Sequence, residues 1–346
     1  MIKLDITGRN GSSCLAVGER LKNLEKYMHG QTVIITDSVV RSLYGDQFPP
    51  CQVVEIGCGE GVKTLETVAK IFERLVELEV DRSGFIVGIG GGIVCDITGF
   101  VASTYLRGIG FGFVSTTLLA QVDASVGGKN GVNFSGYKNM VGVFNQPEFV
   151  ICDMEMLKTL PRREIVSGLA EVVKHACIGD TGLFEFLEES QDSVLALEPH
   201  AVERMVHDSV LIKSAVVNRD EHEQGERRKL NFGHTFGHAF ERILKIPHGE
   251  AVAGGMVAAA VLSKDRGLLT DREVHRIEAL LKTLDLPTRF DVDRGRVIDA
   301  MRRDKKRKGE SINFVLLRGI GNAVVEPITI EALEDSMPRL DLCRLG

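Results

Sequence analysis

The chain has 346 residues, with 42 lysines and arginines against 48 aspartates and glutamates, so its formal net charge is −6. Because single hydrophobic cores stop growing near ~250–300 residues, this length predicts two domains. A hydrophobic share of 44% and a charged share of 26% are typical of globular proteins and weigh against a disordered chain. The acidic balance weighs against nucleic acid as a partner.

The sequence also argues against a membrane protein and against a protein stabilised by disulfides. The best apolar run, residues 252–262, is interrupted by two glycines and is far shorter than the ~20 residues of a membrane-spanning helix. The N-terminus has no apolar leader, so we expect a cytoplasmic protein without a membrane partner. The seven cysteines contain no CxxC pair, which argues against a disulfide scaffold and a cysteine-based zinc site.

Short β-rich runs alternate with helical patterns in the first part of the chain. Strands are expected at residues 32–37, 84–92 and 111–117, and a helix is expected at residues 64–78. This alternation predicts a mostly parallel sheet. From about residue 161 the helical patterns dominate. They predict helices at 165–174, 201–217, 233–244, 250–267 and 272–284, followed by a strand at 312–317. We therefore predict an α/β domain over residues 1–160 and an α-helical domain over residues 161–346.

Two glycine-rich segments are candidate anion sites. Gly90, Gly91 and Gly92 follow an expected strand and precede an expected helix, where backbone N–H groups can approach a diphosphate. They do not fit G-x-G-x-x-G, so a tight turn stays an alternative. The second segment, residues 123–133, carries Lys129 and is followed by Lys138 and Asn139. It lacks the Ser or Thr of a Walker A motif, and its lysines indicate either an anion site or a solvated loop.

The densest group of potential metal ligands lies in residues 231–250, which hold three of the nine histidines. His234 and His238 are four residues apart and so share one helix face, a common zinc-binding arrangement. Spacing alone therefore pairs them and makes His248 the third ligand, with ordinary helical histidines as the alternative. Upstream, Glu171 and Lys174 stand one turn apart among apolar residues, and a half-buried carboxylate needs a cation or a metal.

Taken together, these segments resemble the 3-dehydroquinate synthases, a family of sugar-phosphate cyclases. The resemblance covers most of the chain. Its motifs are GGGIVCDITGF (90–100), STTLLAQVDASVGGKNGVN (115–133), YKNMVGVFNQP (137–147), KTLPRRE (158–164), GLAEVVKH (168–175), LNFGHTFGHAFE (230–241), HGEAVAGGM (248–256) and DKKRKG (304–309). It implies an N-terminal Rossmann-like NAD-binding domain and an all-α, metal-binding C-terminal domain, with the active site between them and usually in a homodimer.

The resemblance also implies which residues act. The metal ligands would be Glu171, His234 and His248, for Zn²⁺ or alternatively Co²⁺, while His238 would face the substrate. The positions implied for NAD⁺ are Asp37, Glu60, Lys63, Gly91, Gly92, Asp96, Thr116, Thr117, Asp123, Lys129, Lys138 and Thr159. The catalytic and substrate positions are Lys129, Asn139, Lys174, Lys213, Arg227, Asn231, His238 and Lys305 or Lys306, with Arg107 from the neighbouring subunit.

The reaction implied for this family converts 3-deoxy-D-arabino-heptulosonate 7-phosphate to 3-dehydroquinate and phosphate. It comprises transient oxidation by NAD⁺, phosphate elimination, re-reduction and an intramolecular aldol closure. Because the substrate carries a carboxylate and a phosphate, several cations are needed to offset its charge. Three positions depart from the family pattern: Ser115 replaces a proline, Cys58 replaces an acidic residue, and Val39 replaces a polar one. These departures concern cofactor affinity.

Three alternatives stay open from the sequence. A related cyclase, such as a 2-deoxy-scyllo-inosose or 2-epi-5-epi-valiolone synthase, would act on a phosphosugar without the carboxylate. Those relatives tend to change the positions of Lys213, Asn231 and His238, which hold the dehydroquinate-type residues here. A metal-dependent glycerol or alcohol dehydrogenase would release NADH and usually has Asp where Glu171 stands. A non-catalytic NAD-binding protein would have no reason to keep all these residues.

Overall fold

The computed structural model describes residues 1–8, 11–302, 307–308 and 311–340. The chain divides into two compact units, of which the first contains residues 1–160 and 202–221 and the second contains 161–201 and 222–346. One division of the chain follows residue 160. Residues 202–221, however, group with the first unit and not with the helical part to which the sequence pattern assigned them.

The first unit is built on a seven-stranded sheet with the strand order β1-β2-β9-β6-β5-β3-β4. Its strands are β1 (Ile2–Gly8), β2 (Gly11–Val17), β3 (Thr32–Asp37), β4 (Gln52–Ile56), β5 (Phe85–Gly90), β6 (Gly110–Ser115) and β9 (Phe149–Cys152). Strands β1 and β2 pair antiparallel, and every other pair in this sheet is parallel. The carboxyl ends of β3, β4, β5, β6 and β9 therefore lie at one edge.

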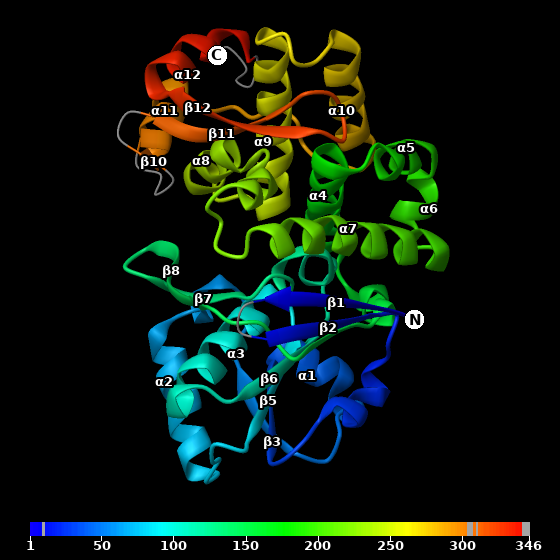
Figure 1. Ribbon diagram of the computed structural model, residues 1–346, viewed down its shortest axis with the longest axis vertical. Coiled ribbons are helices and arrows are strands. Elements are labelled where there is room, and N and C mark those ends of the chain that lie inside the picture. Colours follow the sequence, from blue (N-terminus) through cyan, green and yellow to red (C-terminus); the bar gives the residue numbers. More distant parts are fainter. Residues whose placement is uncertain (9–10, 303–306, 309–310, 341–346) are drawn as a thin grey trace. The chain divides into compact units, whose positions relative to one another are not determined.

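Three helices of the first unit connect these strands, and Figure 1 shows two of them, α2 and α3, beside the sheet. They are α1 (Ser38–Tyr44), α2 (Leu65–Glu77) and α3 (Gly92–Thr104). The Thr64 hydroxyl accepts a hydrogen bond from the Thr67 N–H and so begins α2. Val68, Ile71 and Leu75 form its buried face, as the helical spacing predicts. A two-stranded antiparallel hairpin, β7 (Lys129–Phe134) and β8 (Tyr137–Phe144), completes the unit.

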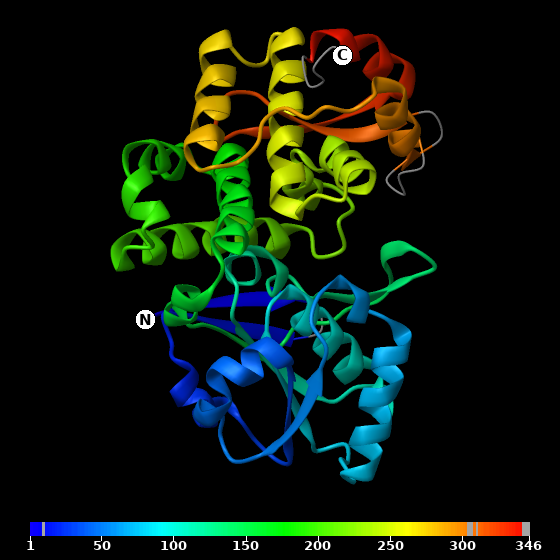
Figure 2. The same cartoon turned by 180° about the vertical axis from the view of Figure 1, so that it is seen from behind.

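The second unit is mainly helical. Its helices are α4 (Arg162–Gly179), α5 (Thr181–Glu189), α6 (Gln191–Leu195), α8 (His234–Leu244), α9 (His248–Asp265), α10 (Asp271–Thr283), α11 (Arg294–Arg302) and α12 (Ile330–Ser336), while α7 (Pro199–Arg219) runs from this unit into the first. A small antiparallel sheet accompanies them, formed by β10 (Arg307–Lys308), β11 (Ser311–Leu317) and β12 (Ala323–Thr329). Figure 2 shows α9 lying against β11, the strand that the sequence predicts at 312–317.

Short helical turns occupy several connections. The 3₁₀ turns are η1 (Leu21–Tyr27), η2 (Gly45–Gln47), η3 (Glu60–Val62), η4 (Tyr105–Arg107), η6 (Met154–Thr159), η7 (Glu226–Asn231) and η8 (Met337–Arg339). One turn, η5 (Ala120–Ala124), is a π-helix. Single π-turns are rare and frequently occur at functional sites.

Close helix contacts in the second unit depend on two glycines of α9. A Cβ atom on Gly249 would lie 2.3 Å from the Ser167 carbonyl oxygen of α4, and one on Gly255 would lie 1.9 Å from the Gly233 carbonyl oxygen that precedes α8. Both distances are far below van der Waals contact, so only glycine permits this approach. The Ser167 hydroxyl also accepts a hydrogen bond from the Gly249 N–H at 3.1 Å. The two glycines thus fix α4, α8 and α9 against one another.

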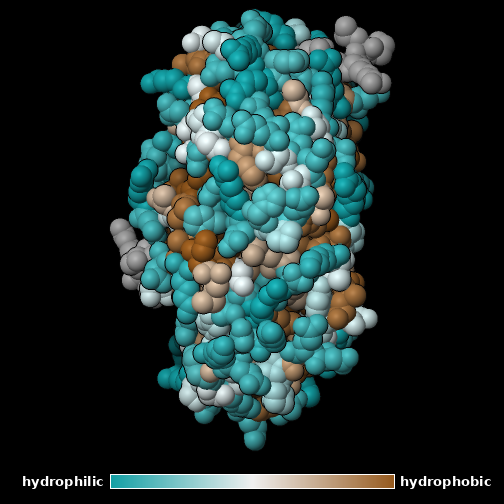
Figure 3. Space-filling model, turned by 90° about the vertical axis from the view of Figure 1, so that its right-hand side faces the viewer, coloured by the Kyte–Doolittle hydropathy of each residue, from teal (hydrophilic) through white to brown (hydrophobic). Residues whose placement is uncertain are grey.

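In the part of the chain that the structure describes, no helix has the length and apolar character needed to cross a bilayer. Figure 3 shows one face, on which hydrophobic residues appear in small groups among hydrophilic ones.

Candidate active site

The three close helices of the second unit bring Glu171, His234 and His248 together. Glu171 lies in the middle of α4, and its side chain is fully buried. His234 is the first residue of α8 and His248 the first of α9. One potential ligand atom from each of the three residues lies within 4.8 Å of the others. A carboxylate with two imidazoles is a donor set that zinc commonly takes in catalytic sites, which keep a further position open.

The ring orientation of both histidines fits this use. His234 Nδ1 lies 3.1 Å from the Phe232 carbonyl oxygen, which can only accept, so Nδ1 carries the proton. The Nε2 atom of His234 then presents a lone pair, 3.6 Å from Glu171 Oε1. His248 Nε2 lies 3.3 Å from the same oxygen. Both Nε2 atoms therefore converge on one carboxylate oxygen, as expected for ligands around a shared cation.

Burial and charge affect the two histidines differently. Burial lowers the pKa of His234 well below its usual 6.5, although Glu171 opposes this, so its imidazole is neutral as a metal ligand must be. Burial also acts to lower the pKa of His248, but hydrogen bonds to Glu171 and Glu241 outweigh it and raise the value to about 9. Glu171 thus attracts positive charge at the point where the three side chains meet.

The spacing argument and the family resemblance made different assignments for His238. The ring centroids of His234 and His238 are 5.4 Å apart, so the two imidazoles are neighbours as the helical spacing predicts. Yet the group that converges on Glu171 contains His234 and His248, and His238 belongs to none of the candidate metal groups found among the described residues. The geometry therefore favours the ligand set implied by the resemblance over the pair that spacing suggests.

Lys174 is the second buried charge of this site. It lies one turn after Glu171 on α4, its side chain is 2% exposed, and its Nζ contacts Glu171 Oε2. The sequence leaves open whether this pair is an exposed ion pair or part of a site, and the near-complete burial excludes the exposed alternative. A buried carboxylate of this kind needs cationic partners on several sides.

The glycine segment of the first unit lies at the carboxyl edge of the sheet. Gly90 ends β5, Gly91 precedes α3 and Gly92 begins it. A Cβ on Gly91 would lie 3.0 Å from Thr117 Cγ2, so Thr117 packs directly on the turn. The first N–H groups of α3 have no partner within the helix and carry its positive dipole end. This backbone suits an anionic group such as a diphosphate.

The two threonines predicted for the cofactor site hold this edge in place. The Thr116 N–H donates to the Gly90 carbonyl at 3.0 Å, which links the ends of β6 and β5. The Thr117 hydroxyl accepts from the Ala120 N–H at 3.1 Å and starts the turn that leads into η5. Neighbouring Ser115, one of the departures from the family pattern, is fully buried. The other two, Cys58 and Val39, are exposed, and Cys58 Sγ lies 3.1 Å from Ser38 Oγ.

A polar network joins η3, α3 and the hairpin. Lys63 Nζ contacts Asp96 Oδ2 and donates to Asn139 Oδ1 at 2.6 Å. Asn133 donates to Glu60 Oε1 at 2.7 Å and accepts from the Asn139 N–H at 2.9 Å. Burial raises the pKa of Asp96, although Lys63 favours its charged form. Residues predicted to contact NAD⁺ and one predicted to contact substrate thus form one connected group.

The π-turn η5 presents Asp123 to Lys213 of α7. Lys213 Nζ donates to both the carbonyl oxygen and Oδ1 of Asp123 at 2.6 Å. Gln121, fully buried in the same turn, donates through Nε2 to the carbonyls of Ser115 and Asp153, each at 3.0 Å. Ser115 is the last paired residue of β6 and Asp153 follows the last paired residue of β9, so Gln121 fastens the turn to the sheet.

The remaining predicted residues occupy varied positions. Asp37 Oδ1 accepts from the N–H groups of Val39 and Val40 at 2.9 Å and caps α1, and Thr159 Oγ1 lies 2.6 Å from the Tyr44 hydroxyl. Lys129, Lys138 and Arg107 are exposed in the first unit. Arg227 is 2% exposed in η7 of the second unit, where Asn231 donates to Glu223. Lys305 and Lys306 lie outside the described residues.

Four residues with clear contacts in these groups were not predicted: Gln121, Asn133, Glu223 and Glu241. Gln121 and Asn133 are neutral amides, whose function depends on partners distant in sequence. Glu241 lies seven residues after His234, which is two helical turns, and this spacing was the signal that could have found it.

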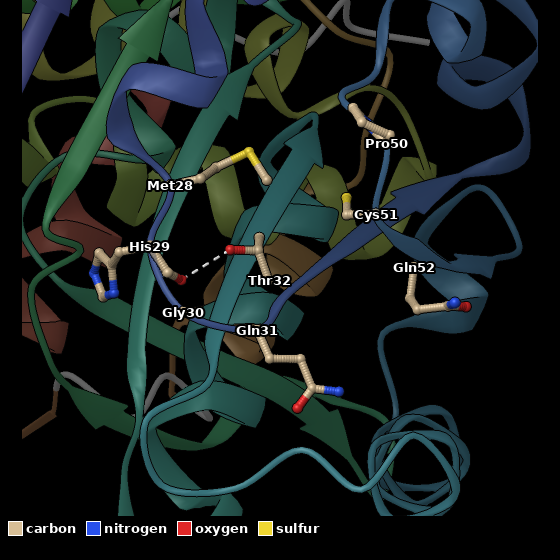
Figure 4. A pocket seen from close by; sticks show the side chains of 8 residues that line it. All are labelled: Met28, His29, Gly30, Gln31, Thr32, Pro50, Cys51 and Gln52. Carbon is tan, nitrogen blue, oxygen red and sulfur yellow. Dashed lines mark hydrogen bonds between the residues drawn. The ribbon is translucent and has the colours of Figure 1, made fainter.

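The first unit also has a cavity of about 350 Å³, which Figure 4 shows in close-up. It is lined by Met28, His29, Gly30, Gln31, Thr32, Pro50, Cys51 and Gln52. Thr32 and Gln52 begin β3 and β4, so the cavity lies at the edge opposite the predicted cofactor residues. It contains none of the residues that the sequence analysis singled out for chemistry.

Comparison with known proteins agrees with this arrangement. The family model described as 3-dehydroquinate synthase N-terminal matches residues 53–167, and the one described as 3-dehydroquinate synthase C-terminal matches residues 168–307. The chain belongs to the 3-dehydroquinate synthase family. Within it, the 3-dehydroquinate synthase of Alkaliphilus metalliredigens is 41% identical, with 96% of this chain and 97% of that protein covered. The enzyme of the same name from Halorhodospira halophila is 43% identical, with 90% and 91% covered.

Solved structures of other cyclases share the fold. A 2-epi-5-epi-valiolone synthase from Streptomyces hygroscopicus subsp. jinggangensis, with NAD⁺ and Zn²⁺ bound, is 29% identical, with a TM-score of 0.88 and 96% and 98% of the two chains covered. A 2-deoxy-scyllo-inosose synthase complexed with carbaglucose-6-phosphate, NAD⁺ and Co²⁺ is 28% identical, with a TM-score of 0.85 and 97% and 99% covered. A probable glycerol dehydrogenase from Sinorhizobium meliloti, at 16% identity and a TM-score of 0.67, shares the fold alone.

Proposed function

We propose that this chain converts 3-deoxy-D-arabino-heptulosonate 7-phosphate to 3-dehydroquinate and phosphate, with NAD⁺ and a divalent metal as cofactors. The observation that carries the proposal is the convergence of His234 Nε2 and His248 Nε2 on buried Glu171 in a chain of this family. Sequence identity also favours this substrate over those of the related cyclases. Curated 3-dehydroquinate synthases are 41% and 43% identical to this chain, whereas the other cyclases of known structure are 28% and 29% identical.

The residues present fit both cofactors. Glu171, His234 and His248 would hold the metal, the two histidines through Nε2, since their Nδ1 atoms already face acceptors. The Gly91–Gly92 turn and the start of α3 would hold the diphosphate of NAD⁺, and the carboxylate of Asp37 at the end of β3 suits a ribose hydroxyl. When bound, NAD⁺ supplies a hydride acceptor and donor, and Zn²⁺ or Co²⁺ polarises a substrate hydroxyl.

The cationic residues serve substrate binding in this proposal. Lys129, Lys174, Lys213 and Arg227 bind the carboxylate and phosphate, which must leave water when the substrate binds. Lys213 is held by Asp123, and Lys174 is held by Glu171, so both ammonium groups are positioned before substrate arrives. His238 lies beside the metal ligands and would serve proton transfer. Asn139 and Asn231 supply amide hydrogen bonds.

The test is an assay of the metal-loaded protein with the heptulosonate phosphate and a catalytic amount of NAD⁺. We expect phosphate release together with 3-dehydroquinate and no net accumulation of NADH, because the hydride returns to the product. Stoichiometric NADH would instead indicate a dehydrogenase. Turnover of a phosphosugar without the carboxylate, but not of the heptulosonate phosphate, would indicate one of the related cyclases.

We also propose that the enzyme acts as a homodimer in the cytoplasm, with Arg107 directed to the site of the second copy. Leu106 and Arg107 both have positive φ values, 50° and 71°, and Leu106 is 40% exposed. Backbone strain at two non-glycine residues is characteristic of functional segments, and an exposed apolar side chain next to a cation suits a contact with another chain. Light scattering of wild type and Arg107→Ala, together with their turnover, checks this. A monomeric active enzyme would contradict it.

A further inference from the structure

We propose that Glu241 is a positioning residue of the metal site, which holds His248 so that its Nε2 atom faces the metal. This inference rests on the metal-dependent function proposed above. It assigns a specific task to a residue outside the predicted ligand set, and it concerns how the chain prepares the site before the metal binds.

The contact that carries the proposal joins the end of α8 to the start of α9. Glu241 Oε2 lies 3.3 Å from His248 Nδ1, and the Glu241 side chain is only 14% exposed. Lys245, with φ of 53°, ends α8 and reverses the chain, and Pro247 precedes His248. His248, the first residue of α9, therefore lies beside the last turns of α8, where its ring contacts Glu241.

The chemistry of the ring makes this contact consequential. An ionised carboxylate only accepts hydrogen bonds, so when His248 gives up one proton to bind a metal, Glu241 keeps the other proton on Nδ1. The lone pair then resides on Nε2, the atom that lies 3.3 Å from Glu171 Oε1. Carboxylates behind ligating histidines fix the tautomer and ring orientation and raise the basicity of the ligand atom.

The two histidines obtain this support from different sources. His234 Nδ1 is oriented by the backbone carbonyl of Phe232 at 3.1 Å, which a side-chain substitution leaves in place. His248 relies on a side chain, and its own side chain is 30% exposed against 11% for His234. His248 is thus the ligand with more freedom to turn, and Glu241 is the group that restrains it.

The experiment measures metal affinity in the absence of substrate. The metal-free full chain is titrated with Co²⁺, followed by its visible absorption and by competition with a chelator. We expect Glu241→Gln, which keeps an acceptor but loses the charge, to weaken binding about 10-fold, and Glu241→Leu to weaken it about 100-fold and alter the spectrum. The control is Glu250→Gln, on the first turn of α9, whose carboxylate lies 3.5 Å from Arg163 Nε. It should bind Co²⁺ like the wild type.

The outcomes separate this inference from the function on which it rests. If the wild type binds no Co²⁺ or Zn²⁺, the proposed metal-dependent function fails. If the wild type binds the metal and Glu241→Gln matches Glu250→Gln, the positioning role of Glu241 is wrong while the function stands. Should Glu241→Leu fail to fold, as judged by circular dichroism, the Glu241→Gln comparison decides by itself.

Discussion

Replacing Lys174 by methionine tests whether the stability of the second unit depends on the buried charge pair of Lys174 and Glu171. Lys174 contacts Glu171, and the two side chains are 2% and 0% exposed. Methionine keeps most of the volume of lysine but removes its charge, so Glu171 loses a compensating cation in a place that water does not reach. Removing one partner of a buried ion pair typically costs about 3–5 kcal/mol of unfolding free energy.

This cost converts to a large thermal shift. For a domain of about 150–250 residues, 1 kcal/mol corresponds to roughly 2–4 °C in Tm, so Lys174→Met should melt about 6–20 °C below the wild type in a chelator. A bound divalent cation restores positive charge next to Glu171. Saturating Zn²⁺ or Co²⁺ should therefore raise the Tm of the variant more than that of the wild type.

Thermal unfolding with and without metal measures both effects. The control is Lys158→Met, which removes a lysine from another pair of the same spacing, with Glu155 at 2.8 Å and side chains 61% and 46% exposed. Because exposed pairs contribute at most about 1 kcal/mol, this variant should melt close to the wild type. If Lys174→Met also melts within that small range, or gains no more from metal than the wild type, the reasoning about buried charge is wrong.

Three further substitutions have distinct expected effects. Gly249→Ala places a Cβ 2.3 Å from the Ser167 carbonyl oxygen. It should lower the free energy of unfolding by about 1–3 kcal/mol and weaken Co²⁺ binding. The control is Gly61→Ala, whose Cβ would have no atom within 4 Å and which should melt like the wild type. Gln121→Leu leaves two buried carbonyls without their donor, costing roughly 1–3 kcal/mol for each. Because Gln121 fastens the turn that carries Asp123, the variant should raise KM for NAD⁺ in steady-state assays. An unchanged KM would show that this turn does not support the cofactor site. His238→Ala should keep Co²⁺ but lose turnover by roughly 10²–10⁴-fold, and release of the metal would restore the ligand pair that spacing suggests.

The elements found from sequence were those with a continuous local signal. Strands β3, β5 and β6 are almost wholly buried and appear in the sequence as short runs rich in apolar residues, and α2 shows its buried face as a helical repeat. Strands β1, β2, β4 and β9 of the same sheet were not predicted; the four buried residues of β9, for example, are too short a run to distinguish from a helix segment.

Candidate site residues could be named from the sequence where the chain contains known motifs. The histidine segment and the glycine turns stand out by composition, and the family resemblance supplied the remaining positions. Spacing alone pairs His234 with His238, whereas His234 and His248 are the histidines grouped with Glu171, because sharing a helix face does not determine which side chains meet that carboxylate. That depends on where α9 packs, which the helical repeat within α8 does not predict.

By itself, the sequence determined the two-part organisation, the parallel sheet and the residue types of a metal and nucleotide site, because these follow from local pattern and chemistry. Only the tertiary structure decided which side chains share a contact. Glu171, His234 and His248 meet because two glycines let three helices approach. Glu241 reaches His248 through the chain reversal between α8 and α9, and Gln121 reaches Asp153 because β6 and β9 pair. Such contacts arise from packing between distant segments, which no local periodicity records.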